Sequence, residues 1–172
     1  MEMLRTAKAD LCFGHLEIKG IEMQNGVINE HGLSKSDFQR FDRVVSGHFH
    51  KHTDDGQIFY CGAQYEMTWS DYQDPKAFHI FDTETRELTR ISNPLTIHKK
   101  IIYDDKKKDY TNFDIQPYNN HFIKLIVLNK TNEEVFDKFL ERLYNEITVH
   151  DLNIVEDLSL IHISEPTRQA MI

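Results

Sequence analysis

Short runs of apolar residues, each ended by glycine or by polar residues, dominate the first hundred positions. Runs of this length between turn residues are typical of buried β-strands. Strands are therefore expected at 9–13, 43–46, 57–62, 76–81 and 88–91. The pair Asp55–Gly56 predicts a hairpin turn before the third strand, and residues 82–85 predict a turn between the last two. Ser34 is expected to cap a helix that begins there.

Beyond residue 103 the pattern changes to strand, helix and strand. Residues 121–128 have a continuous apolar centre, and 148–155 form the closing strand. Between them, apolar residues from Val135 to Tyr144 recur at helical spacing and predict one buried helix face. Thr131 and Glu134 have the spacing of a capping box.

The expected organisation is a β-rich part at 1–103, followed by a small α+β unit at 104–157. The lysine-rich stretch 104–109 divides them and is expected to be a solvated loop. Residues 158–172 do not continue the pattern and resemble translated sequencing-adapter read-through. We expect this segment to be a non-native tail and draw no function from it.

The composition limits the class of protein to which the chain can belong. The 172 residues are 40% hydrophobic and 28% charged, which is typical of a soluble globular protein. No apolar run approaches the roughly 20 residues of a membrane span, and the start lacks the pattern of a signal peptide. A cytoplasmic protein without a membrane partner is expected. Cys12 and Cys61 lie in apolar runs and are expected to be buried thiols, with a disulfide or metal pair as the alternative.

The net charge of −8 argues against a protein that coats DNA without specificity. Such binding depends on lysine and arginine side chains that neutralise phosphates. An enzyme acting on nucleic acid is not excluded, because bound metal ions supply concentrated positive charge.

Histidines carry the most informative motif. Ser46-Gly47-His48-Phe49-His50 follows a β-branched strand, so that two imidazoles can point to one place where the strand ends. Neutral imidazoles suit Mn, Zn or Fe. A surface pair without a ligand would be an equally good interpretation of this motif alone. Gly14-His15 repeats the pattern of buried strand, glycine and histidine, and the two units together favour a metal site.

These segments resemble motifs of the calcineurin-like phosphoesterases. Ser46-Gly47-His48-Phe49-His50 is similar to the last metal-binding motif, and the segment 13–17 is similar to the one before it. One branch of the family is resembled in particular, both in the spacing between the two histidine motifs and in the segments 60–63, 68–71 and 80–85. That branch is the nuclease subunit of the repair complex whose partner is an SMC-type ATPase, as in large tailed phages. The resemblance covers about residues 7–103.

The resemblance implies the C-terminal half of an α/β sandwich of the metallophosphoesterase type, with a small α+β cap. It implies that His15 and His48 ligate one divalent ion and that His50 ligates a second. Mn²⁺ is the expected metal, with Mg²⁺ or Zn²⁺ as alternatives. The implied function is that of a subunit of a metal-dependent DNA endo- or exonuclease in phage recombination and repair. The implied partners are DNA, the SMC-type ATPase and a second copy of the full-length protein, in the host cytoplasm.

Three motifs of the family are missing from the chain: Asp-x-His, Gly-Asp and Gly-Asn-His followed by an acid. They supply the bridging carboxylate, an Asn ligand and a catalytic histidine. Asn119-Asn120-His121 lacks the glycine and the acid. We therefore expect a chain that begins inside a longer protein, contains no catalytic residue beyond the metal ligands, and is inactive alone.

Two further residues lie near the motifs. Glu17 is a candidate to orient His15, although a solvated strand end is an equally good interpretation. His52 is a weaker candidate for a phosphate contact. Two other functions stay open: a phosphoesterase acting on phosphoproteins or small phosphodiesters, and a non-catalytic interaction module. The strand–helix–strand unit favours the nuclease, because it resembles the cap that faces DNA in those enzymes.

Overall fold

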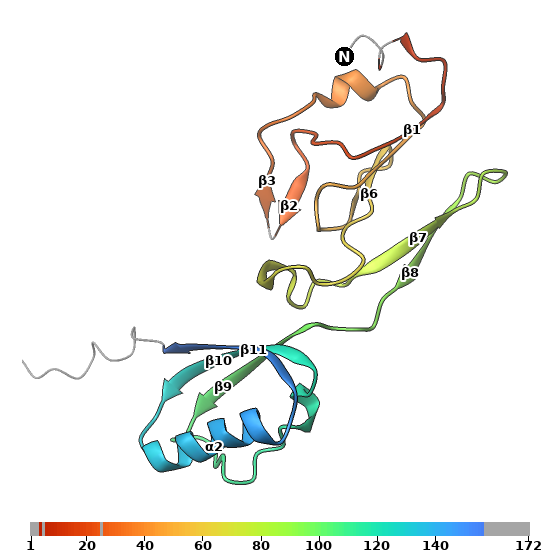
Figure 1. The fold of residues 1–172 in the computed structure, drawn as a ribbon. Coiled ribbons are helices and arrows are strands. Elements are labelled where there is room, and N and C mark those ends of the chain that lie inside the picture. Colours follow the sequence, from red (N-terminus) through yellow and green to blue (C-terminus); the bar gives the residue numbers. More distant parts are fainter. Residues whose placement is uncertain (1–3, 5, 25, 157–172) are drawn as a thin grey trace, which may run out of the picture. The chain divides into compact units, whose positions relative to one another are not determined.

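The computed structural model describes residues 4, 6–24 and 26–156, which form two compact units (Figure 1). Unit 1 is Met1–Thr96 and unit 2 is Ile97–Ile172. The division lies before the expected boundary at residue 103, because β9 (His98–Asp104) pairs with a strand of unit 2. The suspected tail, 158–172, lies outside the described residues. In the described part of the chain, no helix has the length and apolar character to span a membrane.

A four-stranded sheet organises unit 1. Its strands, in spatial order, are β1 (Leu11–Gly14), β4 (Arg43–Ser46), β6 (Ile58–Tyr60) and β5 (Thr53–Asp54). The first three are parallel, and β5 and β6 form the predicted hairpin around the Asp55–Gly56 turn. Gly14 pairs with Ser46, and Ser46 pairs with Tyr60. The three parallel strands therefore end at the same edge of the sheet, and the segments that follow them begin side by side.

The core of unit 1 lies against this sheet and is built from apolar residues of strands and loops. Ser34 is confirmed as an N-cap, since its hydroxyl accepts a hydrogen bond from Ser36 N. The element that follows is a single 3-10 turn, η1 (Lys35–Phe38), and it places Phe38 fully inside the core. A short pair of strands, β2 (Glu22–Gln24) and β3 (Val27–Ile28), lies between β1 and η1 in the sequence.

The predicted second hairpin is confirmed as β7 (Ala77–Phe81) and β8 (Leu88–Ser92), which are antiparallel. Asp82 accepts hydrogen bonds from the backbone N–H groups of Glu84 and Thr85 and stabilises the turn between them. Before this hairpin lies a 3-10 turn, η2 (Trp69–Asp71).

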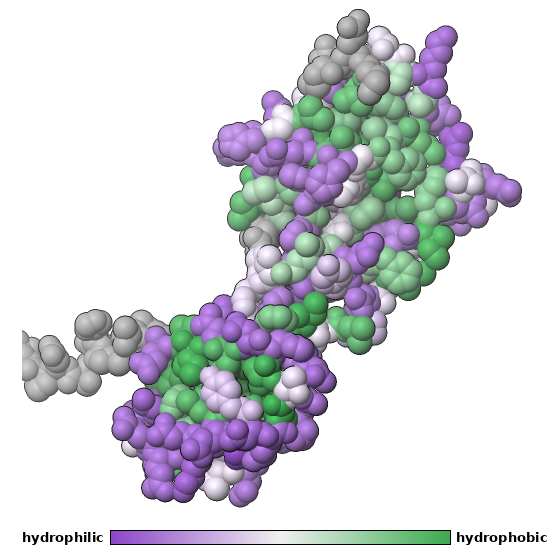
Figure 2. All heavy atoms as spheres, viewed as in Figure 1, coloured by the Kyte–Doolittle hydropathy of each residue, from purple (hydrophilic) through white to green (hydrophobic). Residues whose placement is uncertain are grey.

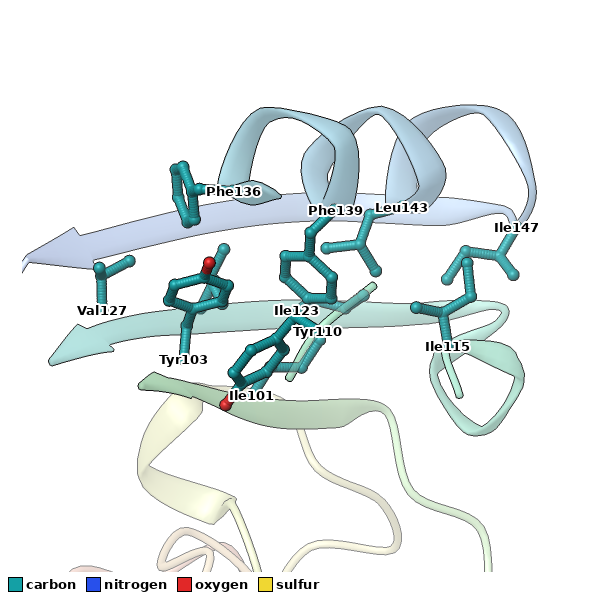
Figure 3. Close-up of a cluster of buried hydrophobic side chains, with 11 residues drawn as sticks. Ile101, Tyr103, Tyr110, Ile115, Ile123, Val127, Phe136, Phe139, Leu143 and Ile147 are labelled. Atoms are coloured by element: carbon teal, nitrogen blue, oxygen red, sulfur yellow. The ribbon is translucent and has the colours of Figure 1, made fainter. Parts of the chain in front are cut away.

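Unit 2 is a three-stranded parallel sheet in the order β11 (Val149–Glu156), β10 (His121–Asn129), β9. The helix α2 (Glu133–Asn145) connects β10 to β11, and η3 (Gln116–Tyr118) precedes β10. Phe136, Phe139 and Leu143 point from α2 toward the sheet (Figure 3). The predicted apolar helix face is therefore confirmed, and it forms the core of unit 2 with Tyr103 and Ile123.

The predicted cap of α2 is wrong by one residue. Asn132 is the N-cap and accepts a hydrogen bond from Val135 N at 3.2 Å. The carboxylate of Asp105 accepts hydrogen bonds from the backbone N–H groups of both Thr131 and Asn132. This contact holds Thr131 outside the helix, so the side chain of Asn132 takes the capping position.

The side chains of the 106–108 lysine run are exposed, as predicted. Figure 2 shows hydrophilic residues around a hydrophobic area on the visible face of unit 2. The described residues thus form a mixed α/β structure with several sheets, which confirms the expected class. A sandwich of the metallophosphoesterase type stays a prediction.

Candidate metal centre

Two histidines emerge side by side where β1 and β4 end. Gly47 N donates a hydrogen bond to Gly14 O at 3.1 Å, which extends the pairing of the two strands to their last residues. Just beyond it, His15 Nε2 and His48 Nδ1 lie 3.3 Å apart. The rings meet edge to face, with an interplanar angle of 83°. The structure thus brings together two of the three predicted ligands through their ring nitrogens.

Buried hydroxyl groups hold the backbone beside His15. Ser46 Oγ accepts a hydrogen bond from Leu16 N at 2.9 Å, and the Tyr60 hydroxyl donates one to Leu16 O at 2.7 Å. Ser46 and Tyr60 are themselves buried at the ends of neighbouring parallel strands. The loop after β1 is therefore fixed by the ends of β4 and β6.

Gly47 leaves the space that the His15 ring occupies. A Cβ atom at position 47 would lie 3.0 Å from His15 Nδ1, so any larger residue would push the imidazole away. The next residue, His48, has a φ angle of +82°. A non-glycine residue in this region is strained by about 1–3 kcal/mol, and such strain is often found at functional sites.

The third predicted ligand, His50, contacts a carboxylate. Its Nδ1 atom lies 3.2 and 3.1 Å from the two carboxylate oxygens of Asp71, the last residue of η2. Asp71 is buried and also accepts a hydrogen bond from Lys76 Nζ at 2.9 Å. Burial alone would raise the pKa of Asp71, but hydrogen bonds from Lys76 and from the backbone of Thr68 and Met67 outweigh it and lower the pKa to about 2.

His15, His48 and His50 all line one open cavity of about 310 Å³. A second hollow of about 220 Å³ is lined by His48, His50, Asp71 and neighbouring residues. The three predicted ligands are therefore gathered around one space. His50 faces Asp71 with Nδ1, which leaves its Nε2 atom without a role in that contact.

The spacing of His15 and His48 fits one shared metal ion. Imidazole nitrogens bound at about 2.0–2.1 Å to a tetrahedral ion lie about 3.4 Å apart. The observed 3.3 Å agrees with that value. Within the described residues, however, no group of three or more His, Cys, Asp or Glu side chains is arranged to hold a metal. Two nitrogens are fewer than a metal ion needs, so the pair alone does not make a complete metal site.

Glu17 and His52, the two weaker candidates, do not contact the three histidines' ring nitrogens in the part of the chain that the structure describes. Glu17 is exposed, and its backbone carbonyl accepts a hydrogen bond from Leu33 N. Its carboxylate forms no hydrogen bond or ion pair with His15 in the part of the chain that the structure describes, which favours the solvated interpretation. His52 donates from Nδ1 to Tyr60 O at 2.8 Å, and its ring packs near Phe59 and His79. These contacts hold its imidazole against β6.

The cysteines are free and half-buried, so they are less buried than expected and form no disulfide with each other. Burial raises the pKa of both the Cys12 and the Cys61 thiol. Asn119-Asn120-His121 lies at the start of β10 in unit 2, where the His121 ring contacts Asn119 O.

Sequence reasoning missed Asp71 and Lys76 as parts of the site. Asp71 lies in the segment 68–71, which was noted only for its resemblance to the nuclease branch. Lys76 was predicted only as the first residue of a strand. One signal was present: an acid and a lysine five positions apart, in a stretch that leads into an apolar strand. That spacing is too common to single out a buried pair.

The sequence of the chain was compared with those of known proteins and with protein-family models. No family model matches the chain. The chain is 31% identical over 160 residues to Exonuclease subunit 1 of Enterobacteria phage T4. The similarity covers 92% of this chain and 44% of the phage T4 subunit, so the chain spans less than half the length of that relative. A match of 160 residues also extends into unit 2, beyond the residues 7–103 for which the resemblance was expected.

Proposed function

We propose that this chain is part of a nuclease subunit that hydrolyses phosphodiester bonds in phage DNA recombination and repair. The similarity to Exonuclease subunit 1 of phage T4 supports a nuclease role. The observation that carries the proposal is the approach of His15 Nε2 to His48 Nδ1, 3.3 Å apart at the ends of two parallel strands. Ends of parallel strands are where open α/β sheets place their sites.

In this proposal His15 and His48 hold one divalent ion and His50 holds a second. Mn²⁺ is the first choice, with Mg²⁺ or Zn²⁺ as alternatives. Two metal ions held in this way would activate a water molecule and stabilise the charge on the leaving oxygen. It also supplies local positive charge for a phosphate in a chain whose net charge is −8.

The residues of this chain have defined tasks around that centre. Ser46 and Tyr60 hold the backbone after His15, and Gly47 leaves room for its ring. His48 and His50 line the shared cavity. These residues bind and orient metal, and none of them is proposed to transfer a proton to the substrate.

The three histidines are proposed to be an incomplete ligand set. The carboxylate and asparagine motifs of the resembling family are missing from the chain, and no three-ligand group is found among the described residues. We therefore propose that residues 1–172 alone hydrolyse DNA poorly or not at all, and that the missing ligands come from outside this chain.

The proposed partners are DNA, an SMC-type ATPase and a second copy of the longer protein, in the cytoplasm of the host. The name of the phage T4 relative describes a subunit, which supports an assembly of several proteins. Unit 2 is proposed as the cap that positions duplex DNA along its backbone.

A non-catalytic interaction module is the second candidate, and the absence of a complete metal site among the described residues favours it. The test is Mn²⁺-stimulated DNA cleavage by the longer protein that contains this chain. His48→Ala and His50→Ala should each abolish cleavage, and His31→Ala, an exposed histidine outside the cavity, should leave it unchanged. Full cleavage by both cavity variants would favour the module.

A further inference from the structure

Unit 1 buries an ion pair beside the cavity. The side chains of Lys76 and Asp71 are each 2% exposed, and their charged atoms lie 2.9 Å apart. Removing two charges from water costs several kcal/mol per ion, so a buried pair is weak support for a purely stabilising role. The pair also contacts a neighbouring side chain, since His50 Nδ1 lies 3.2 Å from the Asp71 oxygen that accepts from Lys76.

The Asp71 carboxylate is surrounded by donors. One oxygen, Oδ2, accepts hydrogen bonds from the backbone N–H groups of Met67 and Thr68, each at 2.9 Å, and the Thr68 hydroxyl lies 3.2 Å from it. The other oxygen, Oδ1, accepts one from Lys76. These contacts hold the carboxylate in its ionised form, which only accepts hydrogen bonds.

His50 must therefore donate to Asp71. Because an ionised carboxylate has no proton to give, the hydrogen of the neutral imidazole has to lie on Nδ1, the atom at 3.1 and 3.2 Å. The lone pair is then on Nε2. The hydrogen bond that one ring nitrogen makes thus decides which nitrogen is free to bind a ligand.

We propose that Asp71 is the positioning residue that fixes His50 in the Nδ1–H tautomer and sets the orientation of its ring. Lys76 supports this arrangement at two points, since its ammonium donates to Asp71 and also to the backbone carbonyl of His50 at 3.1 Å. The use of this tautomer, to offer Nε2 to a metal ion, rests on the proposed function. The tautomer itself does not depend on it.

The test is ¹⁵N NMR of the imidazole nitrogens in the metal-free 172-residue chain at a pH of about 9. In the wild type, His50 should show a protonated Nδ1 and an unprotonated Nε2. In Asp71→Asn, an NH₂ group replaces one of the two oxygens that His50 Nδ1 faces. The amide offers Nδ1 a donor as well as an acceptor, so the tautomer is no longer fixed and a measurable share of Nε2–H should appear.

Asp74→Asn is the matched control. Asp74 also accepts a hydrogen bond from Lys76, at 2.7 Å, but forms no hydrogen bond with His50 among the described residues. This variant should keep the Nδ1–H tautomer. A wild-type His50 protonated on Nε2, or an Asp71→Asn variant with unchanged tautomer, overturns the proposal. The tautomer of His50 in the wild type tests the proposal even if Asp71→Asn does not fold.

The same sample separates the inference from the proposed function. Paramagnetic Mn²⁺ should broaden the signals of His15, His48 and His50, and Asp71→Asn should require about 10–100-fold more Mn²⁺ for equal broadening of His50. If millimolar Mn²⁺ broadens none of the three while His50 keeps the Nδ1–H tautomer, the inference stands and the metal role fails.

Discussion

His15 Nε2 and His48 Nδ1 lie 3.3 Å apart, and each follows a glycine at the end of a parallel strand. Two ring nitrogens that face each other at this distance need something positive between their lone pairs, either a proton on one of them or a shared metal ion. The register of β1 and β4 brings the histidines together, because Gly14 and Ser46 are paired directly.

Gly47→Ala should disrupt this pair without straining the backbone. The added Cβ atom would lie 3.0 Å from His15 Nδ1, so the imidazole has to leave its place. We expect that more Mn²⁺ is needed for equal broadening of the His15 signal in NMR spectra, with little change in the midpoint of urea unfolding.

Gly56→Ala is the control for this substitution. Gly56 has a φ angle of +95° and open space around it, so alanine there strains the turn but touches no histidine. It should lower the free energy of unfolding and leave Mn²⁺ broadening intact. If Gly47→Ala retains normal broadening at His15, the role assigned to Gly47 is wrong.

Much of this site could be predicted from the sequence, because its signals are local. A glycine and a histidine at the end of an apolar run can be recognised without knowing the partner strand, and the parallel pairing then brings Gly14-His15 and Gly47-His48 together. Asp71 could not be found in this way. Its role depends on burial and on the approach of Lys76 and His50, and neither follows from spacing along the chain.

In the fold, too, the features set by neighbouring residues were predicted and those set by tertiary contacts were not. Both hairpins and the buried face of α2 followed from turn residues and periodicity. The cap of α2 did not, because Asp105, far from Thr131 in the sequence, holds Thr131 outside the helix. Likewise, the assignment of β9 to unit 2 depends on pairing with β10, which no local pattern reveals.

The corrected cap makes a prediction about stability. Asn132→Ala should lower the free energy of unfolding by about 0.5–2 kcal/mol, because Val135 N loses its hydrogen-bond acceptor. Thr131→Ala should cost less, since its backbone N–H still donates to Asp105. Urea unfolding followed by circular dichroism of both variants measures the difference. A larger loss for Thr131→Ala would restore Thr131 as the cap.

Tyr103 should make unit 2 sensitive to alkaline pH. Burial, assisted by the negative charge of Asp105, raises the pKa of Tyr103 to about 12. The folded state then keeps a proton that the unfolded chain loses above its ordinary pKa of about 10. Below a pH of about 10, the ionisation of Tyr103 does not affect the free energy of unfolding. As the pH rises from about 10 toward 12, the free energy of unfolding falls by an amount on the order of 2–3 kcal/mol.

Tyr103→Phe tests this account. The Tyr103 hydroxyl is buried and has no hydrogen-bond partner within the described residues, while its ring stacks on Tyr110 with centroids 4.2 Å apart. Phenylalanine keeps the ring contacts and removes the hydroxyl. The variant should be equally stable or more stable at neutral pH, and its stability should fall less between pH of about 10 and 12. A parallel fall in both proteins would show that Tyr103 does not cause it.

The central claim is that His15 and His48 bind one metal ion together. Anomalous X-ray diffraction at the manganese edge, from crystals of the chain soaked in Mn²⁺, tests it most directly. We predict one peak within about 2.0–2.3 Å of both His15 Nε2 and His48 Nδ1, which disappears in His48→Ala crystals. An ordered pair of imidazoles without such a peak, or a peak that contacts neither nitrogen, would contradict the claim.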